Sequence, residues 1–147
     1  MCHPALVRRI VLDSSVIVSA FRSRRGASSR MLGLVAERRI VPLATPALFL
    51  EYEEVLKRPE QLAVSELSFA EVDAALAALA AAVEPVEVHF TWRPQLADAD
   101  DEMVLEAAVN GRADALVTHN LADFAAVAPR FGLALLRPAE LLGRTRP

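Results

Sequence analysis

The sequence contains little of several features that would place it in other classes of protein. Cys2 is the only cysteine among 147 residues, so no internal disulfide can form, and we expect a reducing, cytoplasmic compartment. The longest apolar run, residues 74–83, is well short of the ~18 residues that a membrane span needs. The N-terminal residues also lack the apolar core of a secretion signal. We therefore expect a soluble cytoplasmic protein without a membrane partner.

Basic charge is not in excess either, because the formal net charge is −3. An acidic balance argues weakly against a nucleic-acid partner. The distribution of the basic residues weakens this argument: Lys57 is the only lysine, and arginines occur in groups. Arginine binds phosphate in a bidentate manner, although solvated loop charges are an alternative explanation for these groups. The arginine group that follows the first strand consists of Arg22, Arg24, Arg25 and Arg30.

Several catalytic motifs are absent. The sequence has no glycine-rich phosphate loop, no nucleophile elbow and no Cys/His pair. The three histidines, His3, His89 and His119, lack the spacing of metal ligands. His119 is next to Asn120 and could contact a substrate, although a satisfied or exposed histidine is the simpler interpretation.

What the sequence does contain is an alternation of apolar strands and helices in one domain. Strands are predicted at residues 9–13, 40–44, 86–90, 114–118 and 133–136. Helices are predicted at residues 28–38, 46–57, 68–83, 101–110, 120–128 and 138–142. Because the strands are almost uniformly apolar, we expect a parallel sheet of about five strands that helices cover on both faces. Residues 91–100 are predicted to form a turn.

Capping signals set the predicted helix ends. Ser28 is predicted to cap the first helix, and Thr45 is predicted to cap the second, with Pro46 at its first position. Residues 68–71, SFAE, have the spacing of a capping box. Gly111 follows the helix of residues 101–110, at the position of a C-terminal cap.

Acidic and polar residues lie near the ends of the predicted strands, where parallel sheets bind ligands. Asp13 ends the first strand, and Asn120 and Asp123 follow the fourth. Helical periodicity places Glu51 and Asp101 on the apolar sides of their helices, where an acid is unexpected. We therefore expect these side chains to converge at one edge of the sheet.

Each acid also has a structural explanation. Asp101 could cap its helix or stabilise the helix dipole, and Glu51 could pair with a buried arginine. Asp13 could hydrogen-bond the next turn, and Asp123 could be a surface acid or cap. These separate explanations require four independent coincidences at one edge of the sheet. One shared site would explain all four acids together.

Converging carboxylates repel one another and need protonation or a cation. Oxygen ligands without clustered histidine or cysteine select Mg²⁺ or Mn²⁺ over zinc. The chemistry that such a cluster supports is activation of water and hydrolysis, typically of a phosphodiester bond.

Four segments together resemble the PIN-domain ribonucleases, especially the branch of toxins from toxin–antitoxin pairs. They are VLDSSVIVSAFRSRRGASSRMLGLV, ATPALFLEYEEVLKRPE, DADDEMVLEAAVNGRADALVTHNLADF and LLRPAEL. The resemblance covers most of the chain, in order and spacing. It implies a single PIN-like nuclease domain over residues 1–147, folded as a three-layer α/β/α sandwich with the first strand in the centre of the sheet.

The resemblance also implies a Mg²⁺- or Mn²⁺-dependent endoribonuclease that hydrolyses single-stranded RNA. Its catalytic acids fall on Asp13, Glu51, Asp101 and Asp123, of which Asp13 and Asp101 would hold the metal. Glu51 and Asp123 would act through water. Ser14, Thr118 and Asn120 would support the site, and the arginines Arg22, Arg24, Arg25 and Arg30 would meet RNA phosphates. The implied partners are an RNA substrate and a cognate antitoxin protein, with a homodimer as a further expectation.

Three positions depart from the family pattern. Ser14 and Ser15 stand where relatives usually have Thr-Asn, and Asn120 replaces an acid. These departures motivate an alternative function, a non-catalytic PIN-fold module that binds a protein or RNA. A receiver-like phosphoacceptor is disfavoured, since that function needs a lysine after the last strand and Lys57 lies elsewhere.

Overall fold

The core of the protein is a sheet of five parallel strands in the order β3-β2-β1-β4-β5. It is seen in a computed structural model that describes residues 7–89, 95–96 and 98–145. The strands are β1 (Arg9–Leu12), β2 (Val41–Ala44), β3 (Glu84–Pro85), β4 (Ala115–Val117) and β5 (Ala134–Leu136). The predicted sheet and the central position of the first strand are confirmed.

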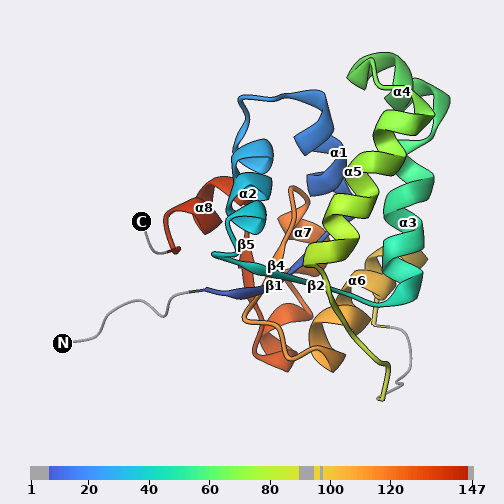
Figure 1. Ribbon diagram of the computed structural model, residues 1–147. Coiled ribbons are helices and arrows are strands. Elements are labelled where there is room, and N and C mark those ends of the chain that lie inside the picture. Colours follow the sequence, from blue (N-terminus) through green and yellow to red (C-terminus); the bar gives the residue numbers. More distant parts are fainter. Residues whose placement is uncertain (1–6, 90–94, 97, 146–147) are drawn as a thin grey trace.

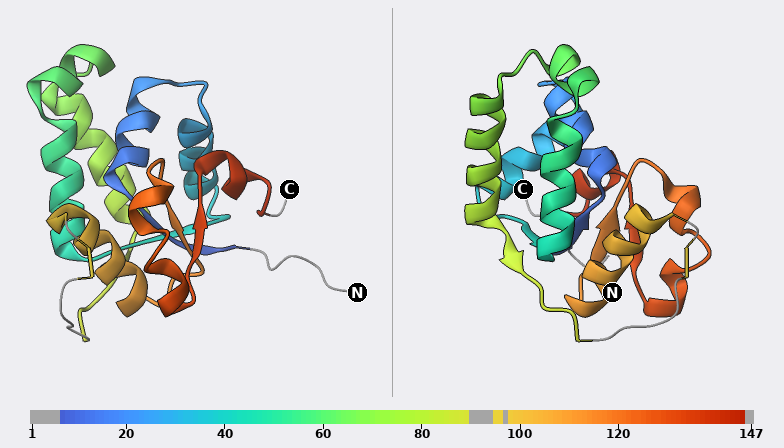
Figure 2. Two further views of the ribbon diagram at one scale, coloured as in Figure 1. Left: turned by 180° about the vertical axis from the view of Figure 1, so that it is seen from behind. Right: turned by 90° about the vertical axis from the view of Figure 1, so that its right-hand side faces the viewer.

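Helices cover both faces of this sheet, as predicted for an α/β/α sandwich. They are α1 (Ser14–Arg22), α2 (Ala27–Ala36), α3 (Pro46–Leu56), α4 (Pro59–Ser65), α5 (Phe69–Ala82), α6 (Ala99–Asn110), α7 (Leu121–Phe124) and α8 (Pro138–Leu142), with a 3-10 turn at Ala128–Phe131. Helices α1, α2 and α5 lie on one side of the strands and α6 lies on the other (Figures 1 and 2). Within the described part of the chain, no helix is long and apolar enough to cross a membrane.

Three of the predicted caps are confirmed. The Thr45 side chain accepts a hydrogen bond from the Leu48 N–H at 3.1 Å. Ser68 and Glu71 form both bonds of the capping box, each 3.1 Å long. Gly111 ends α6 in a crowded position, where a Cβ atom would lie 2.9 Å from the Val86 side chain. These short-range signals set the helices that surround the sheet.

The prediction that Ser28 caps a helix is wrong. Helix α2 begins at Ala27 after Gly26, so Ser28 lies inside its first turn. Ser28 is buried, and its hydroxyl lies 3.0 Å from Nε2 of His119. The Ser28 hydroxyl therefore contacts His119, which is distant in sequence, and does not cap the helix.

The predicted strand at residues 86–90 is also misplaced. The strand is β3, which ends at Pro85, and only the Val86 N–H continues toward β2, with a 3.0 Å bond to the Ala44 carbonyl. Strand β2 ends at Ala44 because Pro46 begins α3, so the residues after Val86 have no strand beside them. Phe90, and residues 91–94 and 97 of the predicted turn, lie outside the described residues.

Helices α1 and α4 have no counterpart in the prediction. Helix α1 buries Val16, Ile17 and Ala20, which lie on one helical face. It leads directly away from the end of β1 and thereby fixes the direction in which the chain leaves Asp13.

Candidate metal centre

The candidate site lies where the order of strands reverses. From β1 the chain adds β2 and β3 on one side, and it adds β4 and β5 on the other. In open parallel sheets, such a reversal opens a crevice at the carboxyl ends of the strands. The Asp13 N–H donates to the Val117 carbonyl at 2.9 Å, and the Thr118 N–H donates to the Leu136 carbonyl at 2.9 Å. Asp13 and Thr118 therefore leave the sheet side by side at this reversal.

The Asp13 carboxylate is held at one oxygen. Its Oδ2 accepts hydrogen bonds from the hydroxyls of Thr118, at 2.7 Å, and Ser15, at 2.9 Å. Asp13 stands at the N-cap position of α1, yet its side chain accepts no backbone N–H there. Capping therefore does not explain this acid.

The other oxygen of Asp13, Oδ1, has no hydrogen-bond donor among the described residues. The Asp13 residue is only 4% exposed, but every fully buried side-chain oxygen or nitrogen in the described residues has a hydrogen-bond partner. Oδ1 accepts no hydrogen bond from the described residues, so it is not one of the fully buried atoms. One oxygen is therefore held by two hydroxyls, and the other accepts no hydrogen bond from the described residues.

Asp101 belongs to the same electrostatic cluster. It is the third residue of α6, whose N-cap is Asp98, with its side chain 2.8 Å from the Asp100 N–H. Burial, together with the smaller effects of the charges of Asp13, Asp98, Asp123 and Asp100, raises the pKa of Asp101 to about 6. The capping explanation for Asp101 is therefore wrong, because Asp98 performs that role.

Asp123 lies in α7, close enough to raise the pKa of Asp101, and its residue is exposed. Asp13 after β1, Asp101 in the first turn of α6 and Asp123 in α7 therefore share one region. No arginine or lysine of the described chain forms an ion pair with Asp13, Asp101 or Asp123. Among the described residues, the negative charge of this region is consequently not balanced by an ion pair.

Glu51 lies at the border of this region. It is only 7% exposed, which confirms the predicted position on the apolar side of its helix. Burial raises the pKa of Glu51, with smaller contributions from Asp100 and Glu54, while Arg58 lowers it. The described residues contain no ion pair to Glu51, so the explanation by a buried arginine partner receives no support.

Tyr52, the next residue, explains how α3 reaches the site. Its buried hydroxyl donates a hydrogen bond to the carbonyl of Leu12, the last residue of β1. Burial raises the pKa of the Tyr52 hydroxyl, as does the charge of Asp13, so it remains a donor. Sequence reasoning missed Tyr52, because only the folded chain brings residues 12 and 52 together.

The donor set fits a hard divalent cation in its chemistry and charge. Mg²⁺ prefers carboxylate oxygens and commonly uses one or two of them, keeping several waters. Within residues 7–89, 95–96 and 98–145, no group of three or more His, Cys, Asp or Glu side chains is close enough to hold an ion. The described residues therefore form no assembled metal site, and the assignment of Asp13 and Asp101 as metal ligands stays a prediction.

The supporting residues differ in what they contact. Thr118 is fully buried and bonds Asp13, and its oxygen accepts the Asn120 N–H at 2.9 Å. The Asn120 side chain makes no cap bond to α7 and is exposed. In the described structure the Ser14 hydroxyl makes no hydrogen bond, whereas Ser15 supports Asp13. The sequence resemblance, in which relatives have Thr-Asn at positions 14 and 15, gave no indication of this role for Ser15.

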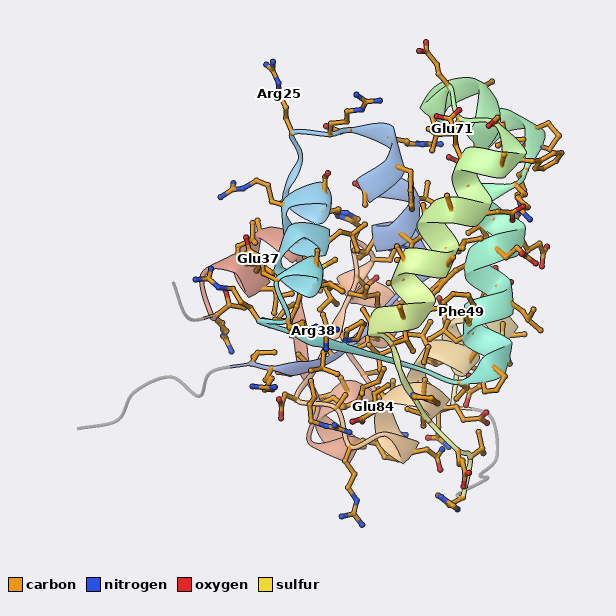
Figure 3. The ribbon with its side chains drawn as sticks, viewed as in Figure 1. Arg25, Glu37, Arg38, Phe49, Glu71 and Glu84 are labelled. Atoms are coloured by element: carbon orange, nitrogen blue, oxygen red, sulfur yellow. The ribbon has the colours of Figure 1, made fainter. Side chains whose placement is uncertain are left out.

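The predicted RNA-binding arginines flank the site. Helix α1, with nine residues, separates Asp13 from the loop that carries Arg24 and Arg25, a distance of about 13 Å. Arg25 points away from the body of the protein (Figure 3). Arg22 donates to Gln61 of α4 at 3.1 Å, and Arg30 is an exposed residue of α2. The described contacts place none of these side chains in the acidic region, and their contact with RNA phosphates stays a prediction.

Comparison with protein families agrees with the fold. A family model described as PIN domain matches residues 9–122, which is most of the chain and includes Asp13, Glu51 and Asp101. No curated protein matches the chain.

Proposed function

Because the chain belongs to the PIN-domain family, whose members are generally nucleases, we propose that it is a Mg²⁺- or Mn²⁺-dependent endoribonuclease acting on single-stranded RNA. The observation that carries this proposal is the Asp13 carboxylate. It lies at the strand reversal, with one oxygen held by two hydroxyls and the other without a hydrogen bond from the described residues. Asp101 and Asp123 add further negative charge beside it.

Asp13 and Asp101 are the residues that would hold the cation. When bound, such a cation supplies Lewis acidity toward a phosphodiester and makes water a better nucleophile. The Ser15 and Thr118 hydroxyls orient the Asp13 carboxylate, because both donate to its Oδ2.

Glu51 and Asp123 have different roles in this proposal. Glu51 is buried and its pKa is raised, so it can exchange a proton with water closer to neutral pH than an ordinary glutamate can. Asp123 is exposed at the opening, where it can orient a water molecule. The exposed side chain of Asn120, in the same loop region, can donate a hydrogen bond to a phosphate oxygen.

The arginines provide the sequence-independent part of RNA binding. Arg22, Arg24, Arg25 and Arg30 are all exposed, and their guanidinium groups can form bidentate contacts with phosphates. A single strand that crosses the acidic region can reach the loop between α1 and α2, because Ser28 of α2 contacts the loop that carries Asn120.

A role as a toxin is a more specific proposal than nuclease activity, and it rests on the sequence resemblance. A toxin of this kind has a cognate antitoxin that blocks its activity, and a homodimer is compatible with it. Expression of the wild-type chain should arrest bacterial growth, while expression of Asp13→Asn should not. Growth arrest by both proteins would contradict a toxic activity that depends on this site.

The experiment that tests the nuclease proposal uses labelled single-stranded RNA, double-stranded RNA and single-stranded DNA. Each is incubated with purified protein in Mn²⁺ or in chelator. We expect internal cuts in single-stranded RNA in Mn²⁺ only. Cleavage in chelator would contradict a metal-dependent reaction. Binding of RNA without cleavage in either condition would favour the non-catalytic binding module.

A further inference from the structure

Two successive backbone N–H groups orient the hydroxyls that hold Asp13. The His119 N–H donates to Ser15 Oγ at 3.3 Å, and the Asn120 N–H donates to Thr118 Oγ1 at 2.9 Å. Each hydroxyl oxygen is thus occupied as an acceptor, and each hydroxyl proton is directed to Oδ2 of Asp13. The orientation of Asp13 therefore depends on the position of the loop between β4 and α7.

This loop has a side-chain attachment to another layer of the protein. Nε2 of His119 lies 3.0 Å from the hydroxyl of Ser28, in the first turn of α2. Ser28 is only 2% exposed, whereas His119 is an exposed residue. A hydrogen bond between them fixes the loop to a rigid helix, whichever of the two groups supplies the proton.

We propose that the pair of His119 and Ser28 is a positioning device for the Asp13 carboxylate. The pair holds the loop in place, the loop's N–H groups orient Ser15 and Thr118, and these hydroxyls leave Oδ1 free for a cation. His119 and Ser28 touch neither substrate nor metal in this role. The inference rests on the proposed function only in the identity of the ligand, since the hydrogen bonds belong to the metal-free protein.

The geometry also explains how Ser15 can occupy a position where relatives have an amide. A serine hydroxyl rotates freely, so by itself it would not select Asp13 as its acceptor. The His119 N–H occupies the oxygen of Ser15 and removes this ambiguity. The contact between His119 and Ser28 then preserves the arrangement, although the two residues lie 91 positions apart in the chain.

The test compares His119→Ala, Ser28→Ala and the double variant with the wild-type protein. His119→Gln is the conservative variant, because its amide can reach the Ser28 hydroxyl. His89→Ala and Ser29→Ala are the matched controls: His89 is an exposed histidine outside the site, and Ser29 adjoins Ser28 on the same helix.

Two readouts are needed. The first is hydrogen exchange of the His119 and Asn120 amides in the metal-free protein, measured by NMR. The second is the affinity for Mn²⁺ alone, measured by calorimetric titration. Both are independent of RNA cleavage. Thermal melting identifies any variant that fails to fold.

We expect His119→Ala and Ser28→Ala to accelerate exchange of both amides. We expect each to weaken Mn²⁺ binding on the order of 10-fold, the lower end of the effect of losing a partner of a metal ligand. The double variant should be no weaker than either single variant, because all three lack the same bond. His119→Gln should recover most of the affinity, and both controls should match the wild type.

Normal amide exchange and normal Mn²⁺ affinity in folded His119→Ala and Ser28→Ala would overturn the inference. A lower melting temperature with unchanged exchange and affinity would also overturn it, because the pair would then be only structural. A third outcome is faster exchange and weaker Mn²⁺ binding in the variants, together with a wild type that binds Mn²⁺ but does not cleave RNA. This outcome would support the positioning role and refute the nuclease proposal. The two failures can thus be distinguished.

Discussion

Replacement of Asp101 by asparagine should stabilise the protein at neutral pH when no divalent cation is present. An aspartate in an unfolded chain titrates near pH 3.9, whereas the pKa of Asp101 in the folded protein is about 6. The folded state therefore binds this proton more tightly. The contribution of Asp101 to stability is fully present below about pH 4 and is lost as the pH rises through 6.

The magnitude follows from the size of this pKa shift. A shift of about two units corresponds to about 3 kcal/mol, but Asp101 is only half-buried and solvent screening reduces the effect. We expect Asp101→Asn to raise the free energy of unfolding by about 1 kcal/mol at pH 7.5 in chelator, which corresponds to a rise in melting temperature of roughly 2 to 4 °C. At pH 4 the difference should nearly vanish.

The assay is thermal unfolding, followed by circular dichroism, of the wild type, Asp101→Asn and a control variant. Glu106→Gln is a suitable control, because Glu106 lies further along the same helix. With Mn²⁺ at a hundred times its dissociation constant, the wild type should gain ~2.7 kcal/mol and the Asp101→Asn variant much less. A lower melting temperature of Asp101→Asn in chelator at pH 7.5 would refute the reasoning, since Asp101 would then be an ordinary stabilising acid at a helix start.

Three further predictions follow from particular contacts. Asn120→Asp should fold normally and bind Mn²⁺ more tightly, because Asn120 is exposed and an added carboxylate contributes charge; weaker binding in a titration would contradict its place beside the cluster. Replacing Arg24 and Arg25 by glutamine should flatten the salt dependence of RNA affinity by roughly 0.7 per lost phosphate contact; an equal loss at all salt concentrations would contradict phosphate binding. Tyr52→Phe should destabilise the protein by about 1 kcal/mol, because it removes the buried bond to Leu12; an unchanged denaturant midpoint would show that this bond contributes nothing.

The sheet and several helix ends could be predicted from the sequence because their signals are local. Apolar runs identified the central strand, and Thr45 and Ser68 cap the helices that they were predicted to cap. Helix α1 was not predicted, since Val16, Ile17 and Val18 are β-branched and carry little local preference for a helix. Packing against α2 and α3 stabilises this helix, and the sequence does not contain those contacts explicitly.

The positions of the candidate acids were partly predictable. Strand ends and helical periodicity selected Asp13, Glu51 and Asp101 from the sequence; in the structure the charge of Asp13 acts on Asp101 and Glu51 is buried, while their role as site residues stays a prediction. The hydrogen-bond partners were not predictable. Ser28 was interpreted as a cap because serine is a common capping residue, but its partner, His119, lies 91 positions away. Only the fold reveals which hydroxyl meets which acceptor.

The most direct test of the central claim is cleavage of a circular single-stranded RNA by the wild type and by Asp13→Asn. A circle yields a linear product only through an internal cut, so this assay detects endonuclease activity alone. Glu60→Gln, an exposed acid of α4, serves as the control. We predict that in Mn²⁺ the wild type and the control linearise the circle, that Asp13→Asn leaves it intact, and that chelator stops all cleavage. Equal cleavage by Asp13→Asn and the wild type would contradict the assignment of this site.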